Sequence, residues 1–475
     1  MNGKKLFPLF LLLFALALSS CSGPKGGIVC TVNCGGGGGS LLLAVTAATR
    51  PDSVPGTISI LSFTANISGI TITSAAAGNT FTITPSNPNV DLNKLLSDSV
   101  FLGQASPESS ILSASTITIA SAQVVYCAST SGVAGCNAGS IQTVTGGPWS
   151  VPDNALPTFP SGSTKMAMRL YFDLQNALVL NPAGTAVTSI DFTQALALEW
   201  TALPTAANLT SGQEDYIEDI TGVVTNATSS SVTLQSTTGG TFTANIVTGT
   251  SNLVTAPVVG QVADMDVILN NDGTFTLLVF DQIDTTSNDW IEGVISYAPT
   301  ALNQFQLVTT NFVPATTGSH IGTSLHLGDP VAVTISSGTA FTVDAKNLTV
   351  NTGDNFTNQT DTSNVTPGQV VAVRATSFTA VNGATPASAT VNAVTLRYTR
   401  VSGSPGAGGL TFQFLPTGPY LGIQNLATTY ITNQATIYDL STSGNTVPAN
   451  TPTAIRALYF GPPNTPIFYI AKVRQ

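Results

Sequence analysis

The sequence has little charge. Only 8% of its 475 residues are Asp, Glu, Lys or Arg, against roughly a quarter in ordinary soluble proteins. Hydrophobic residues still make up 43%, which excludes a charge-driven disordered chain. The 14 basic residues face 24 acidic ones, giving a formal net charge of −10. This balance excludes nucleic acid as a partner, because phosphate binding needs clustered Lys and Arg.

Catalytic signatures are missing as well. The sequence contains no nucleophile elbow, zinc-protease helix, phosphate-binding loop or dinucleotide fingerprint. The glycine-rich runs at 35–39 and 406–409 lack the strand-then-helix context that such loops require. With two histidines and no dense acidic cluster, the sequence predicts no enzyme, no cofactor and no metal site.

The N-terminus indicates export. Lys4 and Lys5 precede an apolar run at 6–18. Thirteen residues are too few to span a bilayer, which takes about 20, but they suit an export signal. The run ends in Leu18-Ser19-Ser20-Cys21, which resembles the lipobox of bacterial lipoproteins. The resemblance implies that residues 1–20 are a signal peptide and that Cys21 is acylated; the alternative is an ordinary signal peptide with an incidental cysteine.

Ser22 follows the cysteine, and no Asp is present there. In the sorting logic of that family this resembles a lipoprotein of the outer membrane. Residues 21–40 form the lipidated start and a glycine-rich tether. About 18 such residues behave as a coil that spans roughly 23 Å. The surface is expected to be acidic, which leaves the acyl chains as the expected membrane contact.

Four cysteines remain once Cys21 is lipidated, an even number in an oxidising compartment. Cys127 and Cys136 flank a turn-rich stretch between strand-like runs at 122–126 and 141–144, which predicts a disulfide that closes a hairpin; the alternative is two free thiols. Cys30 and Cys34 could pair within the tether or with another chain. Their C-x3-C spacing is not typical of a metal site.

The body of the chain is predicted to be all-β. Short β-branched or alternating runs are separated by Gly, Pro, Asn and Ser, as at 57–61, 115–120 and 166–172. Only 90–96, with Asp91 as a possible N-cap, reads as one or two helical turns. Eight or so strands in the block 41–205 suit a two-sheet β-sandwich.

Three motifs of this block carry a family resemblance. They are Leu41-Leu-Leu-Ala-Val-Thr46 with Arg50-Pro51, Val90-Asp-Leu-Asn-Lys-Leu95 and Leu170-Tyr-Phe-Asp-Leu174. They resemble an uncharacterised N-terminal domain of bacterial envelope lipoproteins, a transthyretin-like or carboxypeptidase-regulatory-like β-sandwich. The chain departs from that family in reading Ala48-Thr-Arg-Pro51 in place of Asp-Ala-Pro, which leaves any function of that loop open.

The remainder is internally repeated. Ile220-Thr-Gly-Val-Val224 recurs as Ile291-Glu-Gly-Val-Ile295 and, more weakly, as Val401-Ser-Gly403. The copies start 71 and 110 residues apart, so a strict solenoid is not expected. We predict bead-like, self-closed barrels of five or six strands at 214–286, 287–399 (with an insertion) and 400–475. The pattern resembles a small uncharacterised domain akin to oligonucleotide/oligosaccharide-binding (OB) barrels.

Several polar groups are candidate sites with simpler explanations. His320, His326 and Asp329 could bind a metal, but glycines interrupt the segment and ordinary loop histidines are favoured. The segment 270–273 is predicted to be a hairpin turn rather than a calcium loop. The segment 344–361 is rich in Asn, Asp and Thr and could bind calcium, but it is predicted to be a solvated insertion loop.

Two further sets of polar and aromatic residues also have simpler explanations. The acidic residues of the joint between the blocks are predicted to keep a linker solvated; they are Glu214, Asp215, Glu218 and Asp219. The aromatic residues could stack on sugar rings, but burial in the cores is the default interpretation; they are Trp149, Trp200, Trp290, Tyr297, Tyr398 and Tyr420.

Together these features predict a lipid-anchored protein of the cell envelope, placed in the outer membrane, with a structural, adhesive or binding role and no catalysis. One alternative is an array of carbohydrate-binding modules on the cell surface, and another is an assembly factor for an envelope complex. The expected partners are the membrane, through the anchor, and either a glycan or another envelope protein. The ligand, the oligomeric state and the side of the membrane that the protein faces stay open.

Overall fold

The protein is all-β, as predicted. The computed structural model describes residues 41–475, except 54, 76–77, 87, 129–134, 204–208, 284, 300–302, 352–355, 357–361, 383–384, 408–414, 418–428, 441–444 and 462–465. Within that part the one α-helix is the single turn α1 (Leu174–Ala177), and no helix is long and apolar enough to cross a membrane. The segment predicted to be helical holds the short 3₁₀ helix η1 (Lys94–Leu96).

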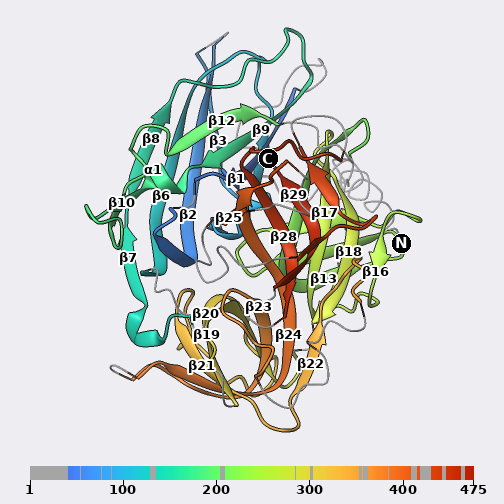
Figure 1. The fold of residues 1–475 in the computed structure, drawn as a ribbon. Coiled ribbons are helices and arrows are strands. Elements are labelled where there is room, and N and C mark those ends of the chain that lie inside the picture. The colour runs from blue at the N-terminus through green and yellow to red at the C-terminus, as the bar shows by residue number, and fades with distance from the viewer. Residues whose placement is uncertain are drawn as a thin grey trace, which may run out of the picture. The chain divides into compact units, whose positions relative to one another are not determined.

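The first block consists of two main sheets that share one core (Figure 1). One has the order β12-β9-β1-β5, with bounds Leu198–Ala202, Lys165–Phe172, Leu42–Thr49 and Val100–Ala105. The other has the order β3-β2-β6-β7, with bounds Thr80–Ile83, Ile58–Ser74, Leu112–Ala128 and Gln142–Gly146. Strand β4 (Asn89–Asp91) pairs with β2, and β8 (Trp149–Asp153) pairs with β6. Strands β10 (Leu178–Leu180) and β11 (Val187–Ile190) form a separate two-stranded sheet. Val45, Phe63, Ile119 and Leu170 are fully buried in the shared core.

The next block is a closed five-stranded barrel. Its strands are β13 (Gln213–Ala227), β14 (Ser231–Ser236), β15 (Thr241–Asn245), β17 (Val262–Asn270) and β18 (Phe275–Ile283). The order β15-β14-β13-β17-β18 is closed by a parallel pairing of β15 with β18. The short strand β16 (Asn252–Leu253) also pairs in parallel with β18. We call this block the first repeat.

The same strand order recurs in the second repeat. Its strands are β19 (Asp289–Tyr297), β20 (Gln304–Val313), β21 (Pro330–Thr334), β22 (Ala340–Val343), β23 (Val370–Thr379) and β24 (Ala387–Ser404). The order is β21-β20-β19-β23-β24, β21 and β24 pair in parallel, and β22 pairs in parallel with β24.

The third repeat begins inside β24. The C-terminal half of that strand pairs with β25 (Leu415–Thr417) and β28 (Thr453–Phe460). Strand β29 (Ile467–Arg474) pairs with β28 and, in parallel, with β26 (Thr429–Ile431) and β27 (Ile437–Asp439). The boundary expected between residues 399 and 400 therefore falls within an 18-residue strand that serves both repeats.

Glycine explains why the repeat is visible in the sequence. A Cβ on Gly222 or on Gly293 would lie 2.3 Å from the carbonyl oxygen of the neighbouring strand. Gly260 and Gly368 both have a positive φ. Their N–H groups donate over 2.8 Å to the carbonyls of Val224 and Ile295, each two residues after the glycine of the motif. In the third repeat Asn450, with φ of 58°, donates in the same way to Pro405. The repeated motif thus corresponds to a repeated close approach of two strands.

This contact gives a prediction. Gly293→Ala is expected to destabilise the protein by about 2–3 kcal/mol, because the added methyl group meets backbone rather than a movable side chain. Gly69→Ala in β2 is the matched control: nothing lies within 4 Å of its Cβ position, so it is expected to be neutral or slightly stabilising. Urea unfolding of the two variants measures the difference, and equal midpoints would contradict the assignment.

The disulfide predicted between Cys127 and Cys136 is present, above the β6–β7 hairpin, with the two Cα atoms 6.4 Å apart. The segment after it contacts the second repeat. The N–H of Cys136 donates to the Ser296 carbonyl over 2.6 Å, and the N–H of Ala138 donates to Gln306 Oε1 over 2.8 Å. The bridge therefore links β6 to a segment, Cys136 to Ala138, that contacts strands β19 and β20.

Replacing both cysteines by serine is expected to lower the free energy of unfolding by about 2.5 kcal/mol, the loop-closure value for nine residues. The loss should appear as a lower thermal midpoint that a reducing agent reproduces in the parent protein. A parent protein whose midpoint does not change on reduction would contradict this prediction.

The blocks share their cores. The hydrophobic cluster of the third repeat, with Val401 and Ile455, also contains Val125 of the first block and Val294 of the second repeat. The described residues, from 41 to 475, belong to one compact unit. In Figure 1 the red strands β28 and β29 lie between the blue-to-teal sheets and the green barrel.

Candidate functional site

A row of cations crosses the third repeat. Arg400 of β24 is paired in register with Arg456 of β28, which is paired in turn with Lys472 of β29. Residues in direct register share a face, so the three positive charges lie side by side and would repel one another if left alone. Tyr398 lies two residues before Arg400, and the Arg456 guanidinium sits 4.4 Å from its ring centroid.

Carboxylates of the first repeat face this row. Asp264 and Asp266 alternate along β17 and are both buried. Glu218 and Asp219 are consecutive in β13, at a shift in register with β17, and Asp219 has a φ of 55°. A regular strand would turn consecutive side chains to opposite faces, but a bulge lets both carboxylates reach the cations. The N–H of Asp219 donates to Asp266 Oδ1 over 2.8 Å and holds the bulge.

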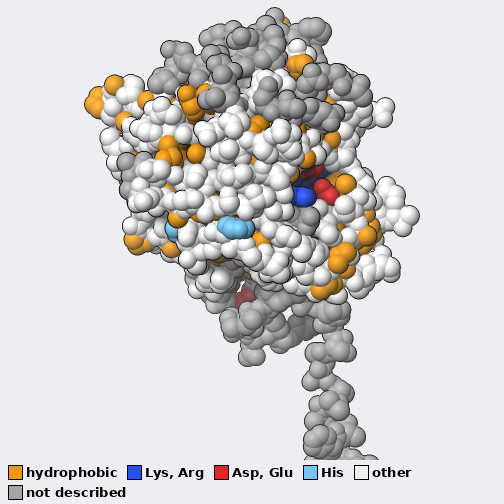
Figure 2. Space-filling view, turned by 90° about the horizontal axis from the view of Figure 1, so that it is seen from below, with side chains coloured by type: hydrophobic (Ala, Val, Ile, Leu, Met, Phe, Trp, Pro, Cys, Tyr) orange, Lys and Arg blue, Asp and Glu red, His pale blue; other side chains and the backbone are white. Residues whose placement is uncertain are grey.

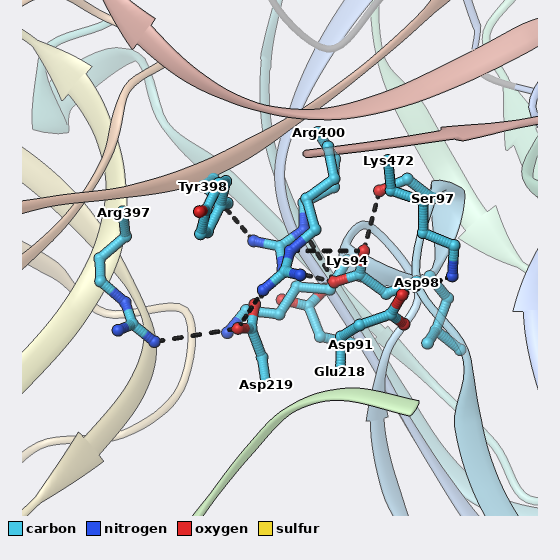
Figure 3. Close-up of polar contacts among 12 residues, drawn as sticks. Asp91, Lys94, Ser97, Asp98, Glu218, Asp219, Arg397, Tyr398, Arg400 and Lys472 are labelled. Atoms are coloured by element: carbon cyan, nitrogen blue, oxygen red, sulfur yellow. Dashed lines mark hydrogen bonds and ion pairs between the residues drawn. The ribbon is translucent and has the colours of Figure 1, made fainter. Parts of the chain in front are cut away.

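Asp219 is the centre of the contacts (Figure 3). Its Oδ1 lies 2.9 Å from Lys346 Nζ and 2.6 Å from Arg456 Nη2, and its Oδ2 accepts from Arg400. Lys346 has a positive φ of 47° and also contacts Asp264 and Asp266, at 3.0 and 2.9 Å. Asp219 and Lys346, which form an ion pair, therefore both have a positive φ, which is unusual for residues other than glycine.

The other contacts extend to the first block and to the second repeat. Arg400 also pairs with Asp98, which follows η1. Lys472 Nζ lies 2.5 Å from Glu218 Oε1. Arg397 Nε lies 3.1 Å from Glu292 Oε2 in β19, and Glu292 pairs as well with Lys94 of η1.

A second group of ion pairs involves β9 and β29. Arg169 Nη2 of β9 lies 2.8 Å from Asp215 Oδ1, and Arg474 Nε lies 2.8 Å from Asp439 Oδ2. Arg474 also donates to Ser99 Oγ over 2.6 Å. The two groups of ion pairs meet because Lys472 and Arg169 both approach Asp439, at 3.9 and 3.6 Å.

We call the whole set the charge network. Its cations are Lys94, Arg169, Lys346, Arg397, Arg400, Arg456, Lys472 and Arg474. Its carboxylates are Asp98, Asp215, Glu218, Asp219, Asp264, Asp266, Glu292, Asp344 and Asp439. These eight cations are most of the eleven Lys and Arg residues that follow residue 40. Nine carboxylates against eight cations leave the network close to neutral, as a buried cluster requires.

The face shown in Figure 2 is correspondingly poor in charge. Figure 2 shows one face on which hydrophobic and uncharged polar groups cover most of the area, and charged side chains show at few points, including a small hollow that holds both signs. The low charge content of the sequence is thus combined with an unusual placement, since most of the cations lie inside.

The two neighbouring carboxylates of β13 titrate in opposite directions. Burial alone would raise the pKa of Asp219, but Arg456, Lys346 and Arg400 hold it well below its usual range. Burial raises the pKa of Glu218 to about 7, and Lys472 offsets that only in part. Glu218 is therefore a member of the network that changes charge near neutral pH.

Two recesses reach the network. One holds about 670 Å³ of space, part of it open to solvent, and is lined by Asp91, Lys94 and Glu218 together with hydroxyl groups of the β14–β15 turn. The other holds about 690 Å³ and is lined by Tyr216, Lys346 and again Glu218. Glu218 borders both recesses.

These shifts predict how stability depends on pH. A carboxyl whose pKa is raised on folding loses stability as pH rises, so Glu218 should remove roughly 3 kcal/mol between pH 4.5 and pH 7. A carboxyl whose pKa is lowered does the opposite, so Asp219 and Asp439 should cost stability as pH falls below about 4. Urea unfolding from pH 3 to 8 should show a maximum near pH 4–5, and Glu218→Gln should flatten its alkaline side. An alkaline side that Glu218→Gln leaves unchanged would contradict the assignment.

The structure corrects two interpretations of the sequence. Asp215, Glu218 and Asp219 do not keep a linker solvated; they lie in β13, within the network, and Glu214 beside them is half-buried. The segment 344–361 is not simply a solvated loop, because Asp344 pairs with Arg397 and Lys346 is buried. Residues 352–355 and 357–361 of that segment lie outside the described part.

The two histidines contact different carboxylates. His320 Nδ1 lies 3.4 Å from Asp289, and His326 Nδ1 lies 3.3 Å from Asp329. Among the residues that the structure describes, no group of three or more His, Cys, Asp or Glu side chains could hold a metal ion. The segment 270–273 forms the turn between β17 and β18, where Gly273 donates to the Asn270 carbonyl.

Three of the five aromatic side chains that were candidates for sugar stacking and that the structure describes are buried in the cores. Trp200 and Trp290 are 4% exposed and Tyr398 is 2% exposed. Trp149 and Tyr297 are half-buried, and Trp149 packs edge-on against a phenylalanine ring. Tyr420, Cys21, Cys30 and Cys34 lie outside the described residues.

Comparison with known proteins gives no relative. No protein-family model, no curated protein and no solved structure matches the chain.

Proposed function

We propose that the protein is a lipid-anchored outer-membrane lipoprotein of the cell envelope, with a structural or adhesive role and no catalysis of its own. In this proposal residues 1–20 are removed, Cys21 carries the acyl chains and 21–40 is the tether. The folded part consists of a two-sheet sandwich followed by three OB-like repeats. In the first two repeats the strands, counted along the chain, have a closed 1-2-3-5-4 order in which strands 3 and 5 are parallel, and this is the arrangement of OB barrels.

The observation that supports this role best is the way in which the charge network joins the blocks. Asp98 belongs to the first block, Asp219 to the first repeat and Glu292 to the second, and all three contact cations of β24. Buried ion pairs of this kind add little net stability but strongly disfavour other arrangements of the same parts. A fixed arrangement suits a stalk or adhesive that must keep its shape between an anchor and a partner.

The same network supports a role without catalysis. Each of its cations has a carboxylate partner within the core, and each carboxylate has a cation. A general base or acid must be free to exchange a proton with substrate. Most of the ionisable groups of the described chain are instead committed to one another.

Metabolic labelling with an alkyne fatty acid tests the anchor. Wild-type protein should take up the label and fractionate with the outer membrane, and Cys21→Ser should lose both properties. A mature N-terminus without acyl groups, established by mass spectrometry, would contradict the proposal.

Protease treatment of intact cells and an adhesion assay test the role. Cells that carry the wild-type protein should differ in attachment or envelope integrity from cells that carry Cys21→Ser at equal expression. Hydrolysis of an envelope polymer by the purified protein, lost on Glu218→Gln, would contradict the absence of catalysis. Binding on a glycan array would favour the carbohydrate-binding alternative.

A further inference from the structure

Five exposed apolar side chains are concentrated on the first repeat. Val247, Leu253, Val254, Val258 and Val259 are 40–59% exposed and lie within thirteen residues of one another. They make up more than half of the large hydrophobic side chains that are exposed in the described part of the chain. We call them the valine patch. Apolar side chains that are exposed this closely along one segment, rather than scattered singly over the chain, indicate a contact with a partner or a membrane.

The backbone holds the valine patch in place. The N–H of Val254 donates to the Phe280 carbonyl over 2.9 Å, and the N–H of Thr250 donates to the Val247 carbonyl over 3.1 Å. After the patch, Gly260 donates to the carbonyl of Val224 over 2.8 Å. The apolar side chains are therefore exposed on an ordered segment that is tied to β13 and β18.

The segment 246–263 contains no Asp, Glu, Lys or Arg. It offers no ion pair to a charged partner and no charge that anionic headgroups would repel. Val and Leu side chains can enter the boundary between headgroups and acyl chains, where the gain depends on buried apolar area. The chemistry of the patch therefore fits a lipid surface.

The chain before the folded part is long enough to permit that contact. Leu42 lies beside Gly273, in the turn between β17 and β18, and Leu253 pairs with Phe280 further along β18. Seven residues of strand separate Gly273 from Phe280, about 23 Å at 3.3 Å per residue. The twenty residues 21–40 can extend to roughly 66 Å, so a bilayer that holds Cys21 is within reach of the patch.

We propose that the valine patch inserts into the membrane in which Cys21 is anchored. This inference rests on the proposed lipidation. The tether keeps the patch near lipid at an effective concentration in the millimolar range, whereas a second copy must be met at its own, lower concentration. Membrane contact would orient the first repeat toward the bilayer.

Fluorescence quenching tests this inference. The full mature protein, purified with its anchor, is reconstituted into vesicles of phosphatidylcholine with brominated acyl chains. The emission of the tryptophan introduced by Val258→Trp should fall about twofold, with the parent protein in the same vesicles as the reference. The loss should also occur at high salt. The matched control is Ile111→Trp in the first block, at a side chain that is 56% exposed, and it should be unaffected. Thermal unfolding of both variants confirms that they are folded.

Equal quenching of both variants, or of neither, would overturn the inference. A dimer in sedimentation velocity that Val258→Ser abolishes, without quenching, would assign the patch to a second copy. Mass spectrometry of Cys21 in the same sample separates the two proposals. If Cys21 is unmodified but position 258 is quenched, the result supports the patch and contradicts only the anchor. If Cys21 is unmodified and position 258 is not quenched, both proposals are overturned.

Discussion

Asp219→Asn is expected to prevent the chain from folding stably. The amide has nearly the size of the carboxylate, and asparagine tolerates a φ of 55° at least as well, so the substitution removes charge and little else. It leaves Lys346, Arg400 and Arg456 buried around a neutral group. Breaking one buried pair costs about 3–5 kcal/mol, and the three cations nearest to this carboxylate would all lose it, so the loss approaches the whole stability of about 5–15 kcal/mol.

Circular dichroism and urea unfolding measure this effect. The matched control is Asp272→Asn in the exposed turn between β17 and β18, which should cost less than about 1 kcal/mol because the carboxylate is exposed and accepts from Thr274 within the same turn. An Asp219→Asn protein that unfolds within about 1 kcal/mol of the parent would show that the network is not needed for folding.

Lys472→Met is expected to have the second largest effect, and one that depends on pH. It leaves the Glu218 carboxylate buried without the ammonium group 2.5 Å away. At pH 8 the loss should be about 3–5 kcal/mol. At pH 5 it should be smaller, because the raised pKa of Glu218 lets that carboxyl take up a proton instead.

The double variant Lys472→Met with Glu218→Gln should recover most of the loss at pH 8, since no unpaired charge is left at that point. Urea unfolding of the two single variants and the double variant gives the coupling energy. Lys165→Met, at an exposed lysine that donates to Asn271, is the control. If the two losses add without coupling at pH 8, Glu218 and Lys472 do not act as a pair.

The fold class and the repeat could be predicted because their causes are local. The alternation of apolar residues in strands is set by which face is buried, and it needs no knowledge of the partner strand. Gly222 and Gly293 are visible as a repeat because each is fixed by one close approach of two strands. Cys127 and Cys136 flank a single hairpin, so their pairing was also a local matter.

The charge network could not be assembled from the sequence because its partners are far apart. Asp98 and Arg400 are separated by 302 residues. The consecutive residues Glu218 and Asp219 read as part of a solvated joint between the blocks. A regular strand would turn them to opposite faces, and the bulge brings both to the cations.

One signal was nevertheless present in the sequence. Asp264 and Asp266 share a face of an apolar strand, and so do Lys472 and Arg474, with the opposite sign. Charges at alternate positions of apolar strands in a chain so poor in charge indicate a buried partner of opposite sign.

The repeats are not the separate beads that the sequence predicts, and the reason is a shared strand. Strand β24 passes from the second repeat into the third, so neither can close its sheet without it. The cations of the third repeat then find their carboxylates on the first repeat, as Arg456 does with Asp219 and Asp266. Local strand patterns predict each sheet, but not the contacts that join the sheets.

Differential scanning calorimetry of the full mature chain carrying Cys21→Ser tests most directly whether the network makes one unit of the four blocks. The account predicts a single transition at pH 5, with a calorimetric enthalpy equal to the van't Hoff enthalpy. Two or more separate transitions, with a calorimetric enthalpy well above the van't Hoff value, would show independent modules and contradict it.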